Sequence, residues 1–130
     1  MDLLVCVIDD ETKLNALLAG FVDLGITGAT VLQSQGMGRR LGSKLPATGE
    51  LQALLASVRP ENSTVFSVIE TQEKLEAAVA LAQRVSGDLD APGTGIVFTV
   101  PLGRVVGLAP ELSGADAPSG HEPRANAGGD

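Results

Sequence analysis

Strand-like and helix-like segments follow one another in the same order twice along this chain, and this order constrains the fold most strongly. Residues 3–8 form a short apolar run rich in β-branched side chains, which predicts a buried strand. The acidic stretch at residues 9–11 suits a helix start, because carboxylates accept hydrogen bonds from free backbone amides there. We expect this helix to end at Gly25 and a second strand to run from Ile26 to Leu32. The apolar residues of the predicted helix recur at helical spacing: Leu14, Leu17, Leu18, Phe21 and Val22.

The second half of the chain repeats this order. A third strand is predicted over Ser63 to Ile69, and Thr71 is suited to cap a second helix. Gly87 is suited to end that helix, and a fourth strand is predicted over Ile96 to Val100. The apolar residues of this second helix are again helically spaced: Leu75, Ala78, Val79, Ala82 and Val85.

The combined order predicts an α+β fold of the ferredoxin-like βαββαβ type, a sandwich of an antiparallel four-stranded sheet and two helices. Right-handed crossovers place the first and third strands at the sheet centre. Residues 1–108 are expected to form this single domain. From Ala109 the composition changes to Ala, Gly, Pro, Ser and charged residues, which predicts a disordered tail over 109–130.

A long connection, roughly residues 33–62, separates the second and third predicted strands. A bare hairpin needs only about 2–5 residues, so this insertion is expected to be functional or disordered. Its first part is rich in glycine and carries Arg39 and Arg40, which favours an anion-binding loop. A solvated loop whose charges only keep it in solution explains the same residues equally well. Its second part, Thr48 to Val58, predicts a short amphipathic helix.

Composition excludes several classes of function. The formal net charge is −7 and the chain has three Phe, no Trp and no Tyr, so we expect no nucleic-acid partner. The single cysteine, Cys6, lies in the first apolar run and is interpreted as core, and the single histidine, His121, lies in the predicted tail. Without a base, a nucleophile or a metal cluster the chain is not expected to be an enzyme. No cysteine framework and no membrane-length apolar run occur, so we expect a cytoplasmic protein without direct membrane insertion.

The first predicted strand is apolar on both of its faces. Leu3, Val5 and Val7 point one way and residues 4, 6 and 8 point the other, whereas a sheet with one wet face should alternate apolar and polar residues. Two helices cover only one face. The hypothesis that follows is that further subunits cover the second face. The alternative is that the 33–62 insertion folds back over its own sheet.

Two stretches of the sequence resemble the PII signal-transduction family. The first is the run from Phe21 to Val31 followed by Gly36-Met37-Gly38-Arg39, which resembles the first helix, second strand and T-loop base of that family. The second is the run from Gly93 to Pro101, which resembles its B-loop and last strand. Both motifs follow the order of that family on the predicted βαββαβ arrangement, and the similarity covers roughly residues 3–108. The chain thus resembles a divergent, PII-like member.

This resemblance implies a homotrimer that binds adenine nucleotides in clefts between subunits. The 33–62 connection would be the T-loop, which changes shape and controls a transporter or an enzyme. Thr30 would lie near the base of the nucleotide. The T-loop base would contribute Gly36, Gly38 and Arg39, with Arg40 in place of the glutamine of the Mg-ATP and 2-oxoglutarate site, and the B-loop would contribute Gly93, Thr94 and Gly95 around the phosphates.

The chain departs from the family pattern at several charged positions. By this resemblance, Thr94 and Ile96 stand where the family has an aspartate and a lysine, and Gly107 and Ala109 stand where it has two arginines after the last strand. Charge-assisted hydrogen bonds are worth about 1.5–3 kcal/mol each, so polyphosphate binding should be weakened. No cofactor is certain; AMP or ADP is the expected effector. The alternatives are a structural trimeric interaction module and a CutA-like trimer, both without nucleotide sensing.

Overall fold

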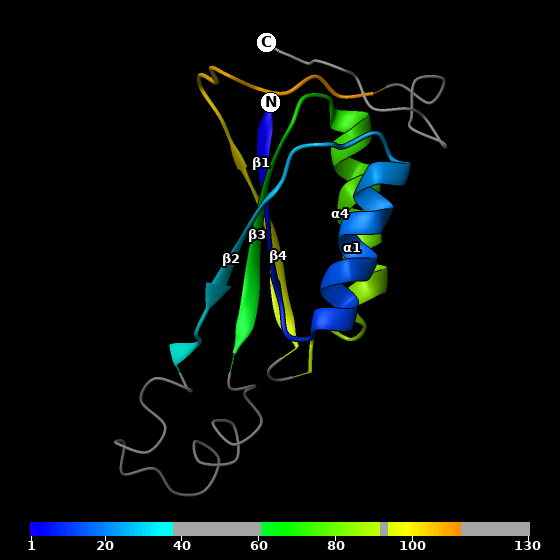
Figure 1. Cartoon of the computed structure of the whole chain (residues 1–130), viewed down its shortest axis with the longest axis vertical. Helices are drawn as coiled ribbons and strands as arrows, with labels where there is room; N and C mark the ends of the chain where they lie inside the picture. The colour runs from blue at the N-terminus through cyan, green and yellow to red at the C-terminus, as the bar shows by residue number, and fades with distance from the viewer. Residues whose placement is uncertain (38–60, 92–93, 113–130) are drawn as a thin grey trace, which may run out of the picture.

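An antiparallel four-stranded sheet lies beside two helices that cover one of its faces, as Figure 1 shows. The computed structural model describes residues 1–37, 61–91 and 94–112. The strand order β2-β3-β1-β4 places the first and third predicted strands at the centre, which confirms the ferredoxin-like prediction. The elements are β1 (Asp2–Ile8), α1 (Glu11–Asp23), β2 (Thr30–Ser34), β3 (Asn62–Ile69), α4 (Gln72–Ser86) and β4 (Gly95–Pro101).

Both helices begin at the capping residues that the sequence predicts. The side chain of Asp10 accepts a hydrogen bond from the Thr12 amide at 2.7 Å, and Thr71 accepts one from the Lys74 amide at 3.2 Å. These bonds satisfy amide groups that have no partner within the first turn. At the end of α1, Gly25 has a φ of +86°, which glycine adopts without the strain of a side chain.

The second strand begins later than predicted. β2 starts at Thr30, so the expected start at Ile26 is wrong. Ile26 is buried in the core and its amide donates to the Phe21 carbonyl at 2.8 Å, directly after the helix. Its β-branched side chain therefore fills the space under the end of α1, and the chain reaches the sheet edge only after Ala29. The strand then continues two residues further than predicted, to Ser34.

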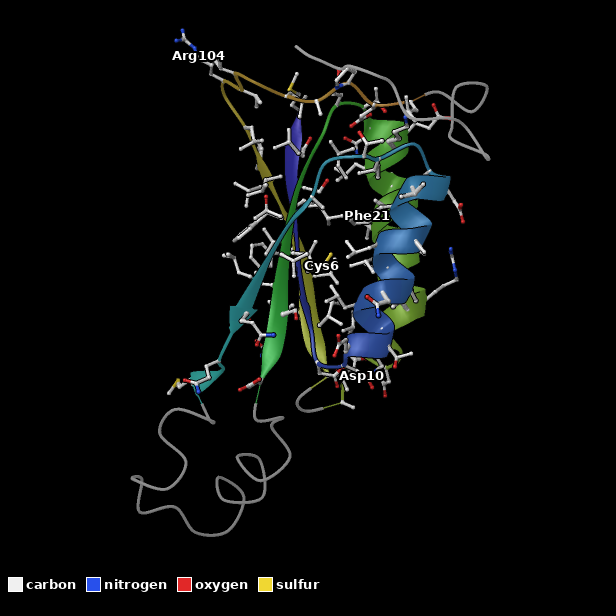
Figure 2. The ribbon with its side chains drawn as sticks, in the orientation of Figure 1. Cys6, Asp10, Phe21 and Arg104 are labelled. Carbon is white, nitrogen blue, oxygen red and sulfur yellow. The ribbon has the colours of Figure 1, made fainter. Side chains whose placement is uncertain are left out.

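The core lies between the sheet and the two helices and is largely aliphatic. Figure 2 shows Cys6 and Phe21 in this layer, and both side chains are buried. Gly20 allows α1 to approach α4 closely, because a Cβ there would lie 2.5 Å from Cδ2 of Leu81. The buried cluster consists of Leu4, Cys6, Ile8, Leu17, Phe21, Ile26, Val65, Ile69, Leu75, Ala78, Leu81 and Ala82.

Burial raises the pKa of the Cys6 thiol from 9.0 to about 11, because the thiolate loses its hydration. The stabilising contribution of the neutral thiol is therefore present below pH 9 and is lost as the pH rises from about 9 to 11. We expect the free energy of unfolding of the wild type to fall by about 2 kcal/mol more than that of Cys6→Val between pH 8 and pH 10.5. Urea denaturation of both proteins at the two pH values measures this difference. Equal losses in the two proteins would contradict it.

The sheet face opposite the helices is apolar and bare among the described residues. Strand pairing aligns its side chains in three rows across the sheet. At the β4 edge Ile96, Phe98 and Val100 are 53%, 44% and 40% exposed, and in β2 Leu32 is 48% exposed. This confirms that β1 is apolar on both sides, whereas the covering subunit remains a prediction. The rows are Val100, Leu3 and Val68; Phe98, Val5, Phe66 and Thr30; and Ile96, Val7, Thr64 and Leu32.

After β4 the chain crosses the end of the sheet and runs over the ends of the helices, in orange in Figure 1. The Leu102 amide donates to the Met1 carbonyl at 3.1 Å, and the Leu112 amide donates to the Gly25 carbonyl at 2.8 Å. Residues 109–112, assigned to the tail by composition, are thus in contact with the domain. Residues 113–130 and the predicted helix from Thr48 to Val58 lie outside the described residues.

No helix in residues 1–37, 61–91 and 94–112 is long and apolar enough to cross a membrane.

Candidate functional site

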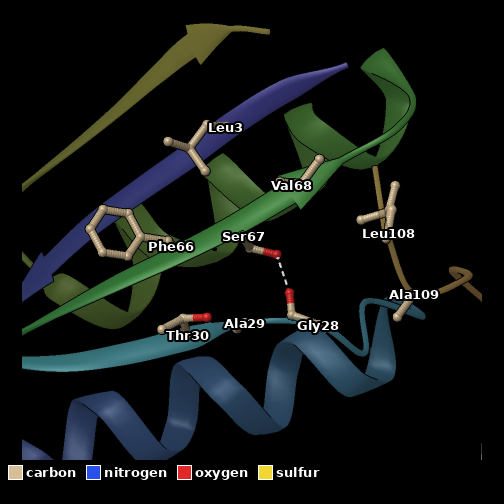
Figure 3. Close-up of a pocket in the computed structure, with 10 residues that line it drawn as sticks. Leu3, Gly28, Ala29, Thr30, Phe66, Ser67, Val68, Leu108 and Ala109 are labelled. Carbon is tan, nitrogen blue, oxygen red and sulfur yellow. Dashed lines mark hydrogen bonds between the residues drawn. The ribbon is translucent and has the colours of Figure 1, made fainter. Parts of the chain in front are cut away.

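A cavity of about 330 Å³ opens where the bare face meets the start of β2. Figure 3 shows its walls, which come from four parts of the chain: β1, the segment before β2, β3 and the segment after β4. Residues far apart in the sequence thus meet at one edge of the sheet. They are Leu3, Gly28, Ala29, Thr30, Phe66, Ser67, Val68, Gly107, Leu108 and Ala109.

The wall in front of β2 is fixed by a buried serine. The Ser67 hydroxyl donates to the Gly28 carbonyl at 2.6 Å, drawn as a dashed line in Figure 3, and Ser67 is only 3% exposed. Gly28 precedes the first paired residue of β2, so the strand ladder does not hold it. The serine bond therefore sets the position of residues 28–30 relative to β3.

The lining residues determine which chemical groups the cavity can accept. Leu3, Phe66, Val68 and Leu108 supply apolar surface, and Thr30 supplies an exposed hydroxyl. None of the lining residues carries a charge. The cavity is therefore suited to an apolar or flat uncharged group that accepts or donates a few hydrogen bonds, and it cannot by itself neutralise a phosphate.

The structure brings together some of the positions that the resemblance singles out. Thr30, expected near the base of a nucleotide, lines the cavity, and so do Gly107 and Ala109, which the resemblance predicts to stand in the places of two family arginines. Small residues allow two walls of the cavity to approach each other here, because a Cβ built at Gly28 would lie 4.0 Å from the Ala109 Cβ.

The described residues of the two loop motifs lie at the other end of the sheet and at opposite edges of it. Gly95 begins β4 and pairs with Ile8, whereas Gly36 follows the end of β2. β2 and β4 are three strand spacings apart, which is roughly 14 Å at about 4.8 Å per spacing. One chain therefore does not bring Gly36 and Thr94 together. The remaining predicted residues lie outside the described residues: Gly38, Arg39, Arg40 and Gly93.

Thr94 and Gly95 both have structural roles in the loop before β4. The Thr94 hydroxyl lies 2.9 Å from the carbonyl oxygens of Asp88 and of Ala91, and it can donate to either. Gly95 has a φ of +126°, and a Cβ there would lie 2.1 Å from the Val7 carbonyl oxygen. Close backbone approach thus explains this glycine without a ligand. Phosphate binding by this loop remains a prediction.

The ends of the 33–62 connection are held together by side chains. Ser34 and Asn62 are opposite each other in the β2–β3 pairing, and the Ser34 hydroxyl donates to the Asn62 side chain. It also lies 2.8 Å from the Thr64 hydroxyl. This polar cluster fixes the base from which the connection leaves the sheet, at the same end as Gly95.

The described residues contain no group of three or more His, Cys, Asp or Glu side chains that could hold a metal ion. A second cavity of about 350 Å³ lies between α4 and β4, with Leu75, Val79 and Val97 among its apolar residues and Asp2 and Glu76 among its acidic ones. It contains none of the predicted site residues.

Sequence reasoning missed most of the cavity wall. Ser67 gave a signal, because it is a polar residue within the otherwise apolar run from Val65 to Ile69 and a buried hydroxyl needs a partner. Leu108 gave none, since its position depends on where the segment after β4 crosses the sheet end.

No protein-family model matches this chain, and no curated protein matches it. The βαββαβ ferredoxin-like topology is compatible with the PII-like fold.

Proposed function

We propose that this protein is a cytoplasmic, non-catalytic regulatory homotrimer of the PII-like type. It binds a small effector between subunits, with AMP or ADP as the expected ligand, and controls a transporter or enzyme through the 33–62 connection. The observation that carries this proposal is the bare apolar sheet face with an uncharged cavity at its edge.

The apolar face supports the assembly of several copies. Large exposed apolar patches on small domains mark interaction sites, because leaving such surface in water costs about 25 cal/mol per Å². All three rows of this face carry exposed or half-buried apolar side chains. Burying them against neighbouring copies removes this cost and creates clefts at the sheet edges.

The distribution of the predicted residues supports a site shared between subunits. In one chain Gly36, Thr94 and Gly95 lie at the end of the sheet opposite the cavity. A neighbouring copy packed on the bare face can contribute its own loops next to the cavity. The cavity then holds the base of the nucleotide, while Arg39 and Arg40 of a 33–62 connection meet the phosphate charge.

The absence of charged residues from the cavity determines which effector it favours. No lining residue of the cavity is charged, and the places of the two family arginines carry Gly107 and Ala109. Each charge-assisted bond that is lost weakens polyphosphate binding by about 1.5–3 kcal/mol. A nucleotide with one or two phosphates is therefore favoured over ATP. The same lack of charge favours the second candidate, a structural trimeric module without a nucleotide.

Calorimetric titration of the assembled protein with AMP, ADP and ATP tests the proposal. We expect binding heat with AMP or ADP, and ATP should bind no more tightly than ADP. Thr30→Val removes one hydroxyl from the cavity at nearly constant volume and should raise the dissociation constant about five- to tenfold. Thr99→Val is the matched control, because Thr99 lies on the other sheet face and does not line this cavity.

Absence of heat with all three nucleotides, on protein whose assembly is intact, would eliminate the nucleotide and leave the structural module. Deleting residues 43–60 then distinguishes the roles of the connection. A signalling loop can be removed without loss of the trimer, whereas a structural segment cannot.

A further inference from the structure

The segment from residue 107 to residue 112, here called the strap, forms a wall of the cavity at its start. At its end it is hydrogen-bonded to other elements of the domain, and these bonds are here called the tie. Its first three residues, Gly107, Leu108 and Ala109, line the cavity. Its last three, Pro110, Glu111 and Leu112, are bonded to other elements. The wall and the tie are therefore adjacent along the same short stretch.

Lys74 of α4 is the main side-chain anchor of the strap. Its Nζ donates to the Leu112 carbonyl at 2.5 Å and lies 3.6 Å from Oε1 of Glu111. The second carboxylate oxygen, Oε2, accepts from the Glu70 amide at 2.9 Å. The side chains of Lys74 and Glu111 are only 22% and 10% exposed, so water screens this ion pair less than a fully exposed one.

Two further bonds tie the strap to the segment after α1. The Leu112 amide donates to the Gly25 carbonyl at 2.8 Å, and the Thr27 hydroxyl donates to the Pro110 carbonyl at 3.2 Å. Close approach is possible only because residue 25 is glycine: a Cβ there would lie 2.0 Å from the Leu112 carbonyl oxygen. Residues 25–30 therefore connect the tie directly to the opposite wall of the cavity.

The stretch before the tie is loosely packed. Nothing lies within 4 Å of a Cβ built at Gly103 or at Gly107, and Gly107 has a φ of +88°. The position of the cavity wall thus depends on the tie at its far end more than on packing along its length.

We infer that the Lys74–Glu111 pair is a latch that holds the strap closed over the cavity and regulates how tightly the effector binds. This inference rests on the proposed function. An effector that contacts residues 107–109 binds only the closed strap, so effector binding and latch closure stabilise each other by the same free energy. Opening the latch must weaken the binding of the effector, and bound effector must slow the opening of the strap.

The test uses Glu111→Gln and Lys74→Met, which change the net charge in opposite directions but both break the latch. Glu76→Gln is the control: it neutralises a carboxylate on α4 that pairs with Gln72, at 2.8 Å, and does not touch the strap. Circular dichroism and light scattering verify fold and assembly of each variant. The probe is AMP, titrated by calorimetry, and hydrogen exchange of peptides spanning residues 102–112 reports the strap.

We expect both latch variants to raise the AMP dissociation constant about five- to tenfold and to speed exchange of the strap, with Glu76→Gln like the wild type. AMP should slow strap exchange in the wild type. Unchanged AMP affinity in both latch variants, or unchanged exchange of the strap, overturns the inference while the proposed function stands. If the wild type itself does not bind AMP, both this inference and the proposed function with AMP as the effector are overturned. Titration of the wild type alone shows this, without any variant.

Discussion

Phe98→Glu should convert the assembled protein into monomers. Phe98 lies in the middle row of the bare face, on the edge strand β4, and is 44% exposed in the single chain. Glutamate at this position can remain hydrated in a monomer, so the fold loses little. In an assembly that buries this face, the carboxylate would be desolvated without a partner, which costs several kcal/mol.

Val22→Glu is the matched control for this substitution. Val22 is 42% exposed, almost the same as Phe98, but it lies on α1 and not on the sheet. Light scattering of both variants over a range of concentrations separates the effects. We expect Val22→Glu to assemble like the wild type. Full assembly of Phe98→Glu would show that the bare face is not the interface.

Gly95→Ala should be the most destabilising of the glycine substitutions at the loop end of the sheet. Its Cβ would lie 2.1 Å from the Val7 carbonyl oxygen, and its φ of +126° is strained for any residue with a side chain. Relief requires the start of β4 to move away from β1. We expect the free energy of unfolding to fall by about 2–4 kcal/mol, the sum of backbone strain and lost pairing.

Substitutions at two other glycines distinguish the cost of backbone strain from the cost of a steric clash. Gly87 has a φ of +80° with nothing within 4 Å of a Cβ, so Gly87→Ala should cost only about 1 kcal/mol. Gly103 has open space and no positive φ, so Gly103→Ala should be nearly neutral. Urea denaturation at one fixed protein concentration compares the three. Equal losses for Gly95→Ala and Gly87→Ala would contradict the close approach to Val7.

Local signals predicted most of the fold. The caps at Asp10 and Thr71 and the strand positions depend on residues within a few places of each other, and the sheet order follows from crossover handedness. The start of β2 was wrong because Ile26 has the side chain of a strand residue but a tertiary role under α1. Propensity cannot distinguish these two uses.

The candidate site was less predictable than the fold, because its walls are joined by long-range contacts. Thr30 was found through resemblance, whereas the bond from Ser67 to Gly28 and the tie from Lys74 to Leu112 connect residues 39 and 38 positions apart. The composition after Ala109 indicates a tail, whereas residues 110–112 are held by partners distant in the sequence. These partners are Gly25, Thr27, Glu70 and Lys74.

The molar mass of the purified wild-type protein tests the central claim most directly. Light scattering on a dilution series should give three times the chain mass of 13.2 kDa, because the apolar face is then buried between copies. A particle with the mass of one chain at all concentrations would mean that the face is not an interface. Without neighbouring copies the shared effector site could not form.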